Sequence, residues 1–176
     1  IFTPRSELPF AGHPTLGSAH ALLEAGLISA RGSRVVQECA AGLVPISAAG
    51  NREDRRLELQ LPTASTRDLT ETEQSRLISI LGAPVLPAST PCLVDVGARW
   101  IVAELESEEA VLGLSPDLGA SACLETDLRA TGVTVFARLG DGTDDIEVRS
   151  FAPSCGVAED PVCGSGNGSV AVYRLA

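Results

Sequence analysis

The feature that most constrains the fold is an internal repeat near the two ends of the chain. The segment ELPFAGHPTLGSAHALL, which begins at Glu7, aligns with EDPVCGSGNGSVAVYRL, which begins at Glu159, when it is shifted by 152 positions. Glutamate, proline, glycine, alanine and leucine recur at equivalent positions, and each copy follows a similar lead-in, FTP or FAP. Two widely spaced copies do not make a solenoid. We therefore expect two similar halves that face each other.

The length, charge and cysteine content limit what the chain can bind. Its 176 residues suit one domain or two small ones. The net charge of −10 argues against nucleic acid and anionic membranes, which attract clustered basic residues, and no apolar run reaches the roughly 18 residues of a membrane span. Five cysteines without a CxxC pair and two histidines predict no metal site and free thiols in a reducing cytoplasm. We expect three of the thiols to lie in the core: Cys39, Cys92 and Cys123.

The first half of the chain predicts one helix and three strands. The segment GHPTLGSAHALLEAGLI has helical apolar spacing, with Pro14 suited to the first turn and Gly26 suited to the end. Residues 31–50 predict two strands with a turn near Gly42, and RRLELQLPT alternates as a half-buried strand. The polar segment TASTRD is expected to close this unit.

The second half predicts further helices and strands. Thr70 and Glu73 form a capping-box pattern at the start of a helix that Gly82 ends. CLVDVGARWIVAEL predicts two strands, SEEAVLGLSPDLGAS a short helix and a loop, and residues 133–151 a hairpin with a Gly/Asp-rich turn. A last helix is expected to start near Gly168. The fold class is therefore α+β with mostly antiparallel strands rather than alternating βαβ units, and we expect the halves to be residues 1–65 and 66–176.

Each copy of the repeat places a glycine-rich turn at the start of a predicted helix. Backbone N–H groups are unpaired at such a position, and the positive end of the helix dipole favours carboxylate or phosphate there. A nucleoside triphosphate is disfavoured because no lysine precedes a Ser or Thr, as a phosphate-binding P-loop requires. Two such turns that face each other would form a cradle for a small anionic substrate.

Several side chains at these turns are candidates for catalysis or binding. His13 lies at the mouth of the first turn and Asp160 at the edge of the second, and such a pair can hold one imidazole tautomer and tune its basicity. Cys163 precedes Gly164 at a helix N-terminus, where we expect the pKa of a thiol to fall. Ser165 could donate its hydroxyl to a substrate or cap the helix. Structural roles remain open for each: turn residues that bond their own backbone, or a small buried residue at Cys163.

These segments resemble the signatures of a known family. FTPRSELPFAGHPTLGSAHALL and RSFAPSCGVAEDPVCGSGNG, together with GARWIVAEL and DGTDDIEVRSFAP, are similar to segments of the PhzF-like family, the phenazine-biosynthesis isomerases and their relatives. The resemblance runs from Ile1 to Ala176. It implies a diaminopimelate-epimerase-like fold, in which two pseudo-symmetric halves each wrap a mostly antiparallel sheet around a central helix and the active site lies between them.

The resemblance also implies an activity. It implies cofactor-independent proton transfer at a carbon of a small carboxylate-bearing metabolite, by isomerisation or epimerisation, in a cytoplasmic protein that we expect to be a homodimer. By the same resemblance, His13 and Asp160 are catalytic, and Gly12, Gly164 and Ser165 bind the substrate carboxylate.

Two departures from the family pattern leave alternatives open. The family's catalytic glutamate precedes the first signature, so we expect this chain, which begins at Ile1 and contains no Met, to be an inactive internal piece of a longer protein with both halves incomplete. The family usually has Thr or another small residue where Cys163 stands, whereas the related epimerases pair two cysteines; the repeat aligns Cys163 with Ala11. A one-cysteine epimerase that uses Cys163 and a non-catalytic module that binds small carboxylates are the two alternatives.

Overall fold

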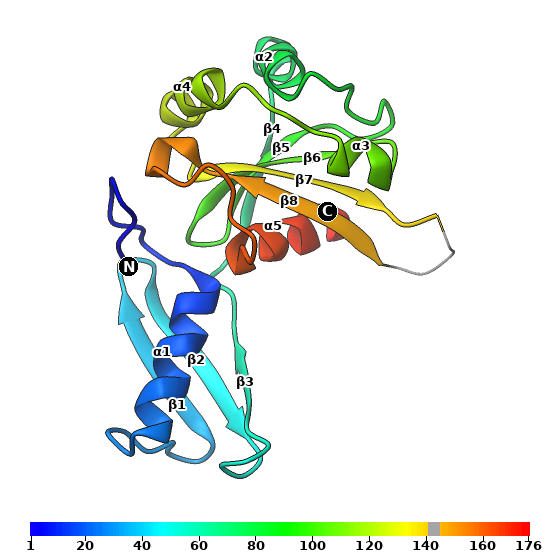
Figure 1. The fold of residues 1–176 in the computed structure, drawn as a ribbon. Helices are drawn as coiled ribbons and strands as arrows, with labels where there is room; N and C mark the ends of the chain where they lie inside the picture. The colour runs from blue at the N-terminus through cyan, green and yellow to red at the C-terminus, as the bar shows by residue number, and fades with distance from the viewer. Residues whose placement is uncertain (141–144) are drawn as a thin grey trace.

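The computed structural model describes residues 1–140 and 145–176 and has a mixed α+β fold with two β-sheets (Figure 1). Each sheet packs against one helix of the sequence repeat. The predicted fold class is therefore confirmed. None of the helices in the described part of the chain is both long and apolar enough to cross a membrane.

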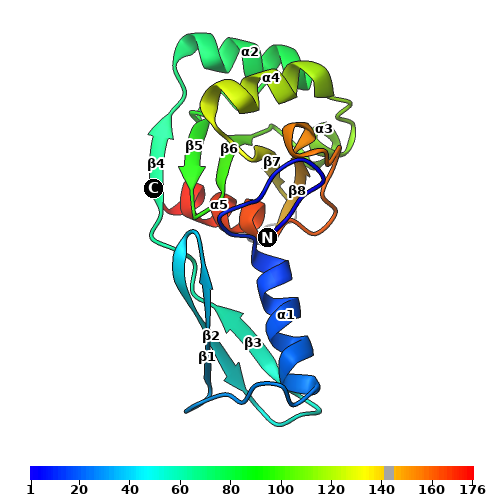
Figure 2. The same ribbon diagram turned by 90° about the vertical axis from the view of Figure 1, so that its left-hand side faces the viewer.

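The first sheet is a three-stranded antiparallel meander that packs beside helix α1 (Gly12–Glu24) (Figures 1 and 2). Its strands, in sheet order, are β1 (Arg34–Cys39), β2 (Gly42–Ala49) and β3 (Arg56–Leu59). One face of β2 is buried through Val44, Ile46 and Ala48, and α1 buries Thr15 and Ala19. This alternation along β2 is what the period of two in a half-buried strand requires.

The second sheet has five strands and is covered on both faces (Figure 1). Its strands, in sheet order, are β4 (Ser65–Asp68), β5 (Cys92–Asp95), β6 (Arg99–Glu104), β7 (Gly132–Arg138) and β8 (Ile146–Phe151). One face carries α2 (Glu71–Leu81), α3 (Glu108–Leu112) and α4 (Leu118–Leu128), and the other carries α5 (Gly164–Leu175). A short 3₁₀ turn, Pro153–Cys155, follows β8.

Strand β6 explains why the centre of this sheet reads as a nearly continuous apolar run. Its alternate residues enter two different cores: Ile101 packs with the helices α2 to α4, and Trp100 and Val102 pack with α5. Both faces of the strand are therefore apolar, as expected for a strand that is covered on both sides.

Most of the predicted elements are confirmed, including the first helix, the strands of both halves and the capped helix. The side chain of Thr70 accepts a hydrogen bond from the Glu73 amide, the Glu73 carboxylate accepts one from the Thr70 amide, and Gly82 ends α2 with a φ of 64°. The Gly/Asp-rich turn predicted between β7 and β8 falls largely on residues 141–144, which lie outside the described residues.

Four predictions need correction. The polar segment TASTRD contains β4, an exposed edge strand that pairs with β5 and needs no apolar face. Residues 118–128, partly expected as loop and otherwise unassigned, form α4, whose first turn is capped by the Asp117 carboxylate. Strands β6 and β7 pair in parallel, with α3 and α4 in the crossover. Helix α5 begins at Gly164 rather than near Gly168, because its glycine-rich first turn is buried against the sheet.

Candidate active site

The N-termini of α1 and α5 meet tip to tip, and glycine makes this approach possible (Figure 2). A Cβ added to Gly12 would lie 3.4 Å from the Cα of Gly164, and a Cβ added to Gly164 would lie 3.2 Å from the amide nitrogen of His13. Both contacts are with backbone atoms, which cannot move aside as a flexible side chain can. The two glycine-rich turns of the repeat therefore lie in direct contact.

Both helix ends carry unpaired amides in the described structure. The N-cap residues of α1 and α5, Ala11 and Cys163, have no side-chain oxygen that could cap the helix, and only the Gly166 amide is directed at the Cys163 thiol. Each α-helix N-terminus corresponds to roughly half a positive charge, so two ends in contact repel each other unless an anion lies between them. No arginine lines the cavity at this junction among the described residues, and the whole sequence contains no lysine. Helix ends arranged in this way can bind an anion through their backbone N–H groups.

A cavity of about 270 Å³ opens at this junction. Of the six site residues predicted from the sequence, five line it: Gly12, His13, Asp160, Gly164 and Ser165. The rest of its wall is mostly apolar and comes chiefly from the N-terminal segment, β6 and the segment after β8. Gly12 and Gly164, which are 152 positions apart in the sequence, therefore line one cavity.

Asp160 is held at the rim of the cavity by its own turn. Its Oδ1 accepts hydrogen bonds from the amides of Val162 at 3.0 Å and Cys163 at 3.1 Å. The preceding residue, Glu159, forms a two-pronged ion pair with Arg149 of β8 at 2.8 and 2.9 Å, and this pair lowers the pKa of Glu159. The two neighbouring carboxylates therefore have different positions: Glu159 anchors the loop to the sheet, and Asp160 lines the cavity.

His13 and Ser165 occupy different environments at the two helix ends. His13 is exposed at the mouth of the cavity, whereas Ser165 is buried with 6% of its surface accessible. The Ser165 Oγ accepts a hydrogen bond of 3.1 Å from the indole Nε1 of Trp100. Water therefore reaches the imidazole freely, while the serine hydroxyl lies in a largely apolar wall.

Cys163 differs from the expectation at two points. It does not line the cavity, and burial raises the pKa of its thiol to about 11, with the Asp160 carboxylate acting in the same direction. Hydrogen bonds from Ser150 and from the Gly166 amide oppose this rise only partly. The prediction that the pKa of Cys163 falls is wrong because desolvation of the buried thiolate outweighs the helix dipole.

Cys163 is nevertheless conformationally unusual. Its backbone has φ 26° and ψ 66°, a region that costs a non-glycine residue of order 1–3 kcal/mol. The hydrogen bond from its amide to Asp160 helps to hold that geometry. The remaining cysteines are only partly as expected: Cys39 and Cys92 are half-buried, whereas Cys123 is exposed on α4 and does not belong to the core.

Sequence reasoning missed several residues of the cavity wall. Phe2, Thr3, Trp100, Thr131 and Cys155 all line it without having been assigned a role. Signals for four of them were present, because Phe2, Thr3, Trp100 and Cys155 lie in segments that resemble the family signatures, whereas Thr131 does not. Strand spacing alone places Trp100 in the core and cannot show that its indole edge reaches a cavity.

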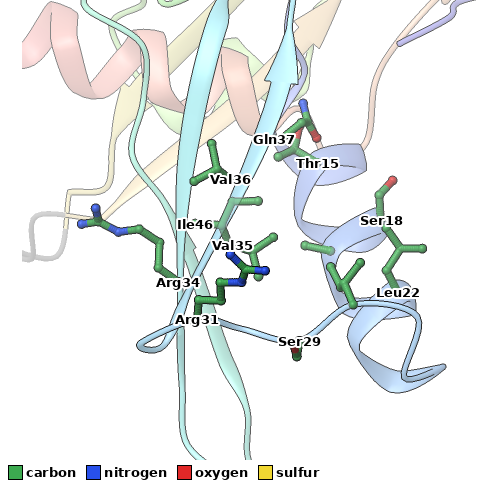
Figure 3. A pocket seen from close by; sticks show the side chains of 12 residues that line it. Thr15, Ser18, Leu22, Ser29, Arg31, Arg34, Val35, Val36, Gln37 and Ile46 are labelled. Carbon is green, nitrogen blue, oxygen red and sulfur yellow. The ribbon is translucent and has the colours of Figure 1, made fainter.

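A larger cavity of about 450 Å³ lies elsewhere, between α1 and strands β1 and β2 (Figure 3). Its wall is formed by apolar side chains, hydroxyls and Gln37, with Arg31 and Arg34 near one end. No His, Cys, Asp or Glu lines it in the described residues. It lacks the groups that proton transfer needs, whereas the cavity at the helix junction holds His13 and Asp160 beside the two helix ends. Within residues 1–140 and 145–176, no cluster of three or more His, Cys, Asp or Glu side chains could hold a metal ion.

Comparison with known proteins identifies the family. The model of the phenazine biosynthesis-like (PhzC-PhzF) family matches residues 1–175. The chain belongs to this family. Among curated PhzF-like relatives, it is 42% identical to antisense-enhancing sequence 1 of Schizosaccharomyces pombe and 37% identical to an uncharacterized isomerase of Pseudomonas aeruginosa. Each match covers 98% of this chain, which spans 59% of the first relative and 58% of the second.

Solved structures show the same fold. A PhzF-family phenazine biosynthesis protein of Bacillus anthracis matches 99% of this chain and 60% of its own length, with a TM-score of 0.81 at 19% identity. A hydroxyproline epimerase of Agrobacterium vitis matches 96% of this chain and 51% of its own length, with a TM-score of 0.60 at 18% identity. The PhzF-like chain therefore has the fold that these two proteins share.

Proposed function

We propose that the chain, with halves at residues 1–65 and 66–176, belongs to an isomerase or epimerase that transfers a proton at a carbon of a small carboxylate-bearing metabolite without a cofactor. The observation that carries this proposal is the meeting of two uncapped helix N-termini in a cavity that also holds His13 and Asp160. Membership of the family and the naming of curated relatives as isomerases support it.

The two helix ends would bind the substrate carboxylate and stabilise the charge that develops on it. When a proton leaves the carbon next to a carboxylate, negative charge moves onto the carboxylate oxygens. Preorganised N–H donors aimed at those oxygens lower the barrier because they need not reorganise during the reaction. In this proposal the amides of Gly12 and Gly164 and the amide and hydroxyl of Ser165 act as those donors.

His13 and Asp160 would orient the substrate and assist the proton transfer. Imidazole and carboxylate groups can each accept and return a proton when they lie within hydrogen-bond reach of the reacting group. The family resemblance assigns removal of the carbon-bound proton to a glutamate that precedes the first signature. The helix-end amides of this chain would then bind the carboxylate. His13 and Asp160 would assist the proton transfer from their side of the cavity.

A thiol mechanism through Cys163 has less support. Cys163 lies outside the cavity wall, and a pKa of about 11 keeps it protonated at neutral pH. A thiol in that state is a poor base. The second alternative, a module that binds small carboxylates without turnover, uses the same helix ends and differs only in whether carbon-bound hydrogen exchanges.

The test is deuterium incorporation by the full-length protein in heavy water. A panel of small amino acids and unsaturated acids is incubated with the protein and followed by proton NMR. The proposal expects one carbon-bound position of at least one acid to exchange, and expects His13→Gln and Asp160→Asn to slow this exchange at least about tenfold. His20→Gln, on the exposed side of α1, and Asp127→Asn, on the surface of α4, are the matched controls. Binding without exchange would favour the binding module, and exchange that needs Cys163 would favour the thiol mechanism.

A further inference from the structure

Trp100 is the single tryptophan of the chain and forms part of the wall of the candidate active site. Only 2% of its surface is accessible, because it lies on a strand whose two faces are both packed. Its indole Nε1 donates a hydrogen bond of 3.1 Å to the Oγ of Ser165, which is also buried. Two cavity-lining residues that are 65 positions apart in the sequence are thus joined by one buried hydrogen bond.

The direction of this hydrogen bond is fixed by chemistry. An indole N–H can only donate, so the Ser165 hydroxyl must be the acceptor and keeps its own hydrogen for another partner. Ser165 is the second residue of α5, and no helical carbonyl four residues earlier is available to take that hydrogen. Since Ser165 also lines the cavity, an acceptor that enters the cavity is the natural partner.

The position of the indole is itself closely determined. Gly132 pairs with Trp100 across the parallel strands, and a Cβ on Gly132 would lie 2.6 Å from the indole Cζ3. The same Cβ would also collide with the carbonyl oxygen of Phe151. Because Gly132 has no side chain, the indole ring has room for the position in which it reaches Ser165.

We propose that Trp100 is a positioning residue: its indole N–H occupies one lone pair of the Ser165 hydroxyl and so directs the hydroxyl hydrogen toward an anionic oxygen of the ligand. The inference rests on the proposed function, because it takes the ligand to be a carboxylate held at the two helix ends. A hydroxyl that is already accepting a hydrogen bond is also a stronger donor, since hydrogen bonds in a chain polarise one another. Trp100 therefore acts on the ligand only through Ser165.

A double-mutant cycle in the full-length protein tests this dependence. The variants are Trp100→Phe, which removes the N–H but keeps an aromatic ring, Ser165→Ala, and the double variant. The probe is benzoate, with uncharged benzamide as its control, and the dissociation constant is measured by calorimetry. Each single variant is expected to weaken benzoate binding about tenfold, with little effect on benzamide, and Trp100→Phe is expected to have no further effect in the Ser165→Ala background.

The opposite result is equal weakening by Trp100→Phe in both backgrounds, which would mean that the indole only packs and would overturn the inference. A second measurement avoids the Trp100 substitution in case that variant does not fold. The indole N–H resonance of isotope-labelled Trp100 is expected to shift when benzoate is added to the wild type and not when it is added to Ser165→Ala. The same shift in both proteins would also overturn it.

Failure of the proposed function gives a different pattern. Coupled binding of benzoate without carbon-hydrogen exchange of any acid would leave the role of Trp100 intact and refute the isomerase. Carbon-hydrogen exchange together with independent effects of the Trp100 and Ser165 substitutions would support the isomerase and refute the role of Trp100.

Discussion

Adding one methyl group at the contact between the two helix ends should weaken both carboxylate binding and the fold. The Cβ of a Gly12→Ala variant would lie 3.3 Å from the carbonyl carbon of Gly164, 3.4 Å from its Cα and 3.5 Å from the amide nitrogen of Ser165. These separations are slightly too short for a relaxed contact with backbone, so the α5 end must move away by a few tenths of an ångström.

These contacts determine the expected losses of unfolding free energy and of benzoate affinity. Overpacking of a closed contact costs about 1–3 kcal/mol, and replacing helical glycine by alanine returns about 0.5–1 kcal/mol, so the net loss of unfolding free energy should be about 1 kcal/mol. A hydrogen bond to a charged group contributes about 1.5–3 kcal/mol. Losing most of one such bond should weaken benzoate binding by about tenfold, since a factor of ten is about 1.4 kcal/mol.

The assay combines urea unfolding with calorimetric titration of benzoate. Gly17→Ala is the matched control on the same helix, because no atom lies within 4 Å of its added Cβ. That control should gain about 0.5–1 kcal/mol of stability and bind benzoate like the wild type. Unchanged benzoate binding by Gly12→Ala, or equal weakening by Gly17→Ala, would refute the view that the helix junction is the anion site.

Three further predictions concern the support of the site. Gly166→Ala should reduce the unfolding free energy by at least about 1–3 kcal/mol, because its Cβ would lie 2.7–2.8 Å from a thiol and two hydroxyls; a wild-type urea midpoint would contradict this. The pKa of the Cys163 thiol is about 11 in the folded protein and 9.0 ordinarily. As the pH rises between these values, the unfolded protein loses the thiol proton while the folded protein keeps it, so the free energy of unfolding should fall. Cys163→Ser should lose this part of the pH dependence, and an unchanged slope would refute the assignment. The buried Glu125 carboxylate accepts from the Ser121 hydroxyl at 2.7 Å and the Ser154 amide at 3.0 Å, so Glu125→Ala should cost about 2–4 kcal/mol and Glu125→Gln about 1 kcal/mol in thermal or urea unfolding; equal losses would contradict the role of these bonds.

The sequence was most informative where local chemistry determines the backbone. The capping box at Thr70 and the glycine-rich turns at Gly12 and Gly164 could be located because few residue types serve those positions. The repeat also indicated that the two turns belong to similar halves. Their direct contact could not be predicted, because it depends on how two sheets and their helices pack and not on either turn alone.

The features that were missed depend on partners far along the chain. Strand β4 has no apolar face and exists because β5 offers a free edge. Trp100 reads as one core residue among many until its partner Ser165 is placed beside it. At Cys163 the sequence argument considered the helix dipole, whereas burial, which only the packed structure reveals, reverses the direction of the pKa shift.

The most direct test of the central claim is a crystal structure of the full-length protein with bound benzoate. The carboxylate oxygens are expected at about 2.7–3.2 Å from the amides of Gly164 and Ser165 and from the Ser165 hydroxyl. Benzoate in the cavity between α1 and β1, or a carboxylate side chain of the protein itself between the two helix ends, would contradict it.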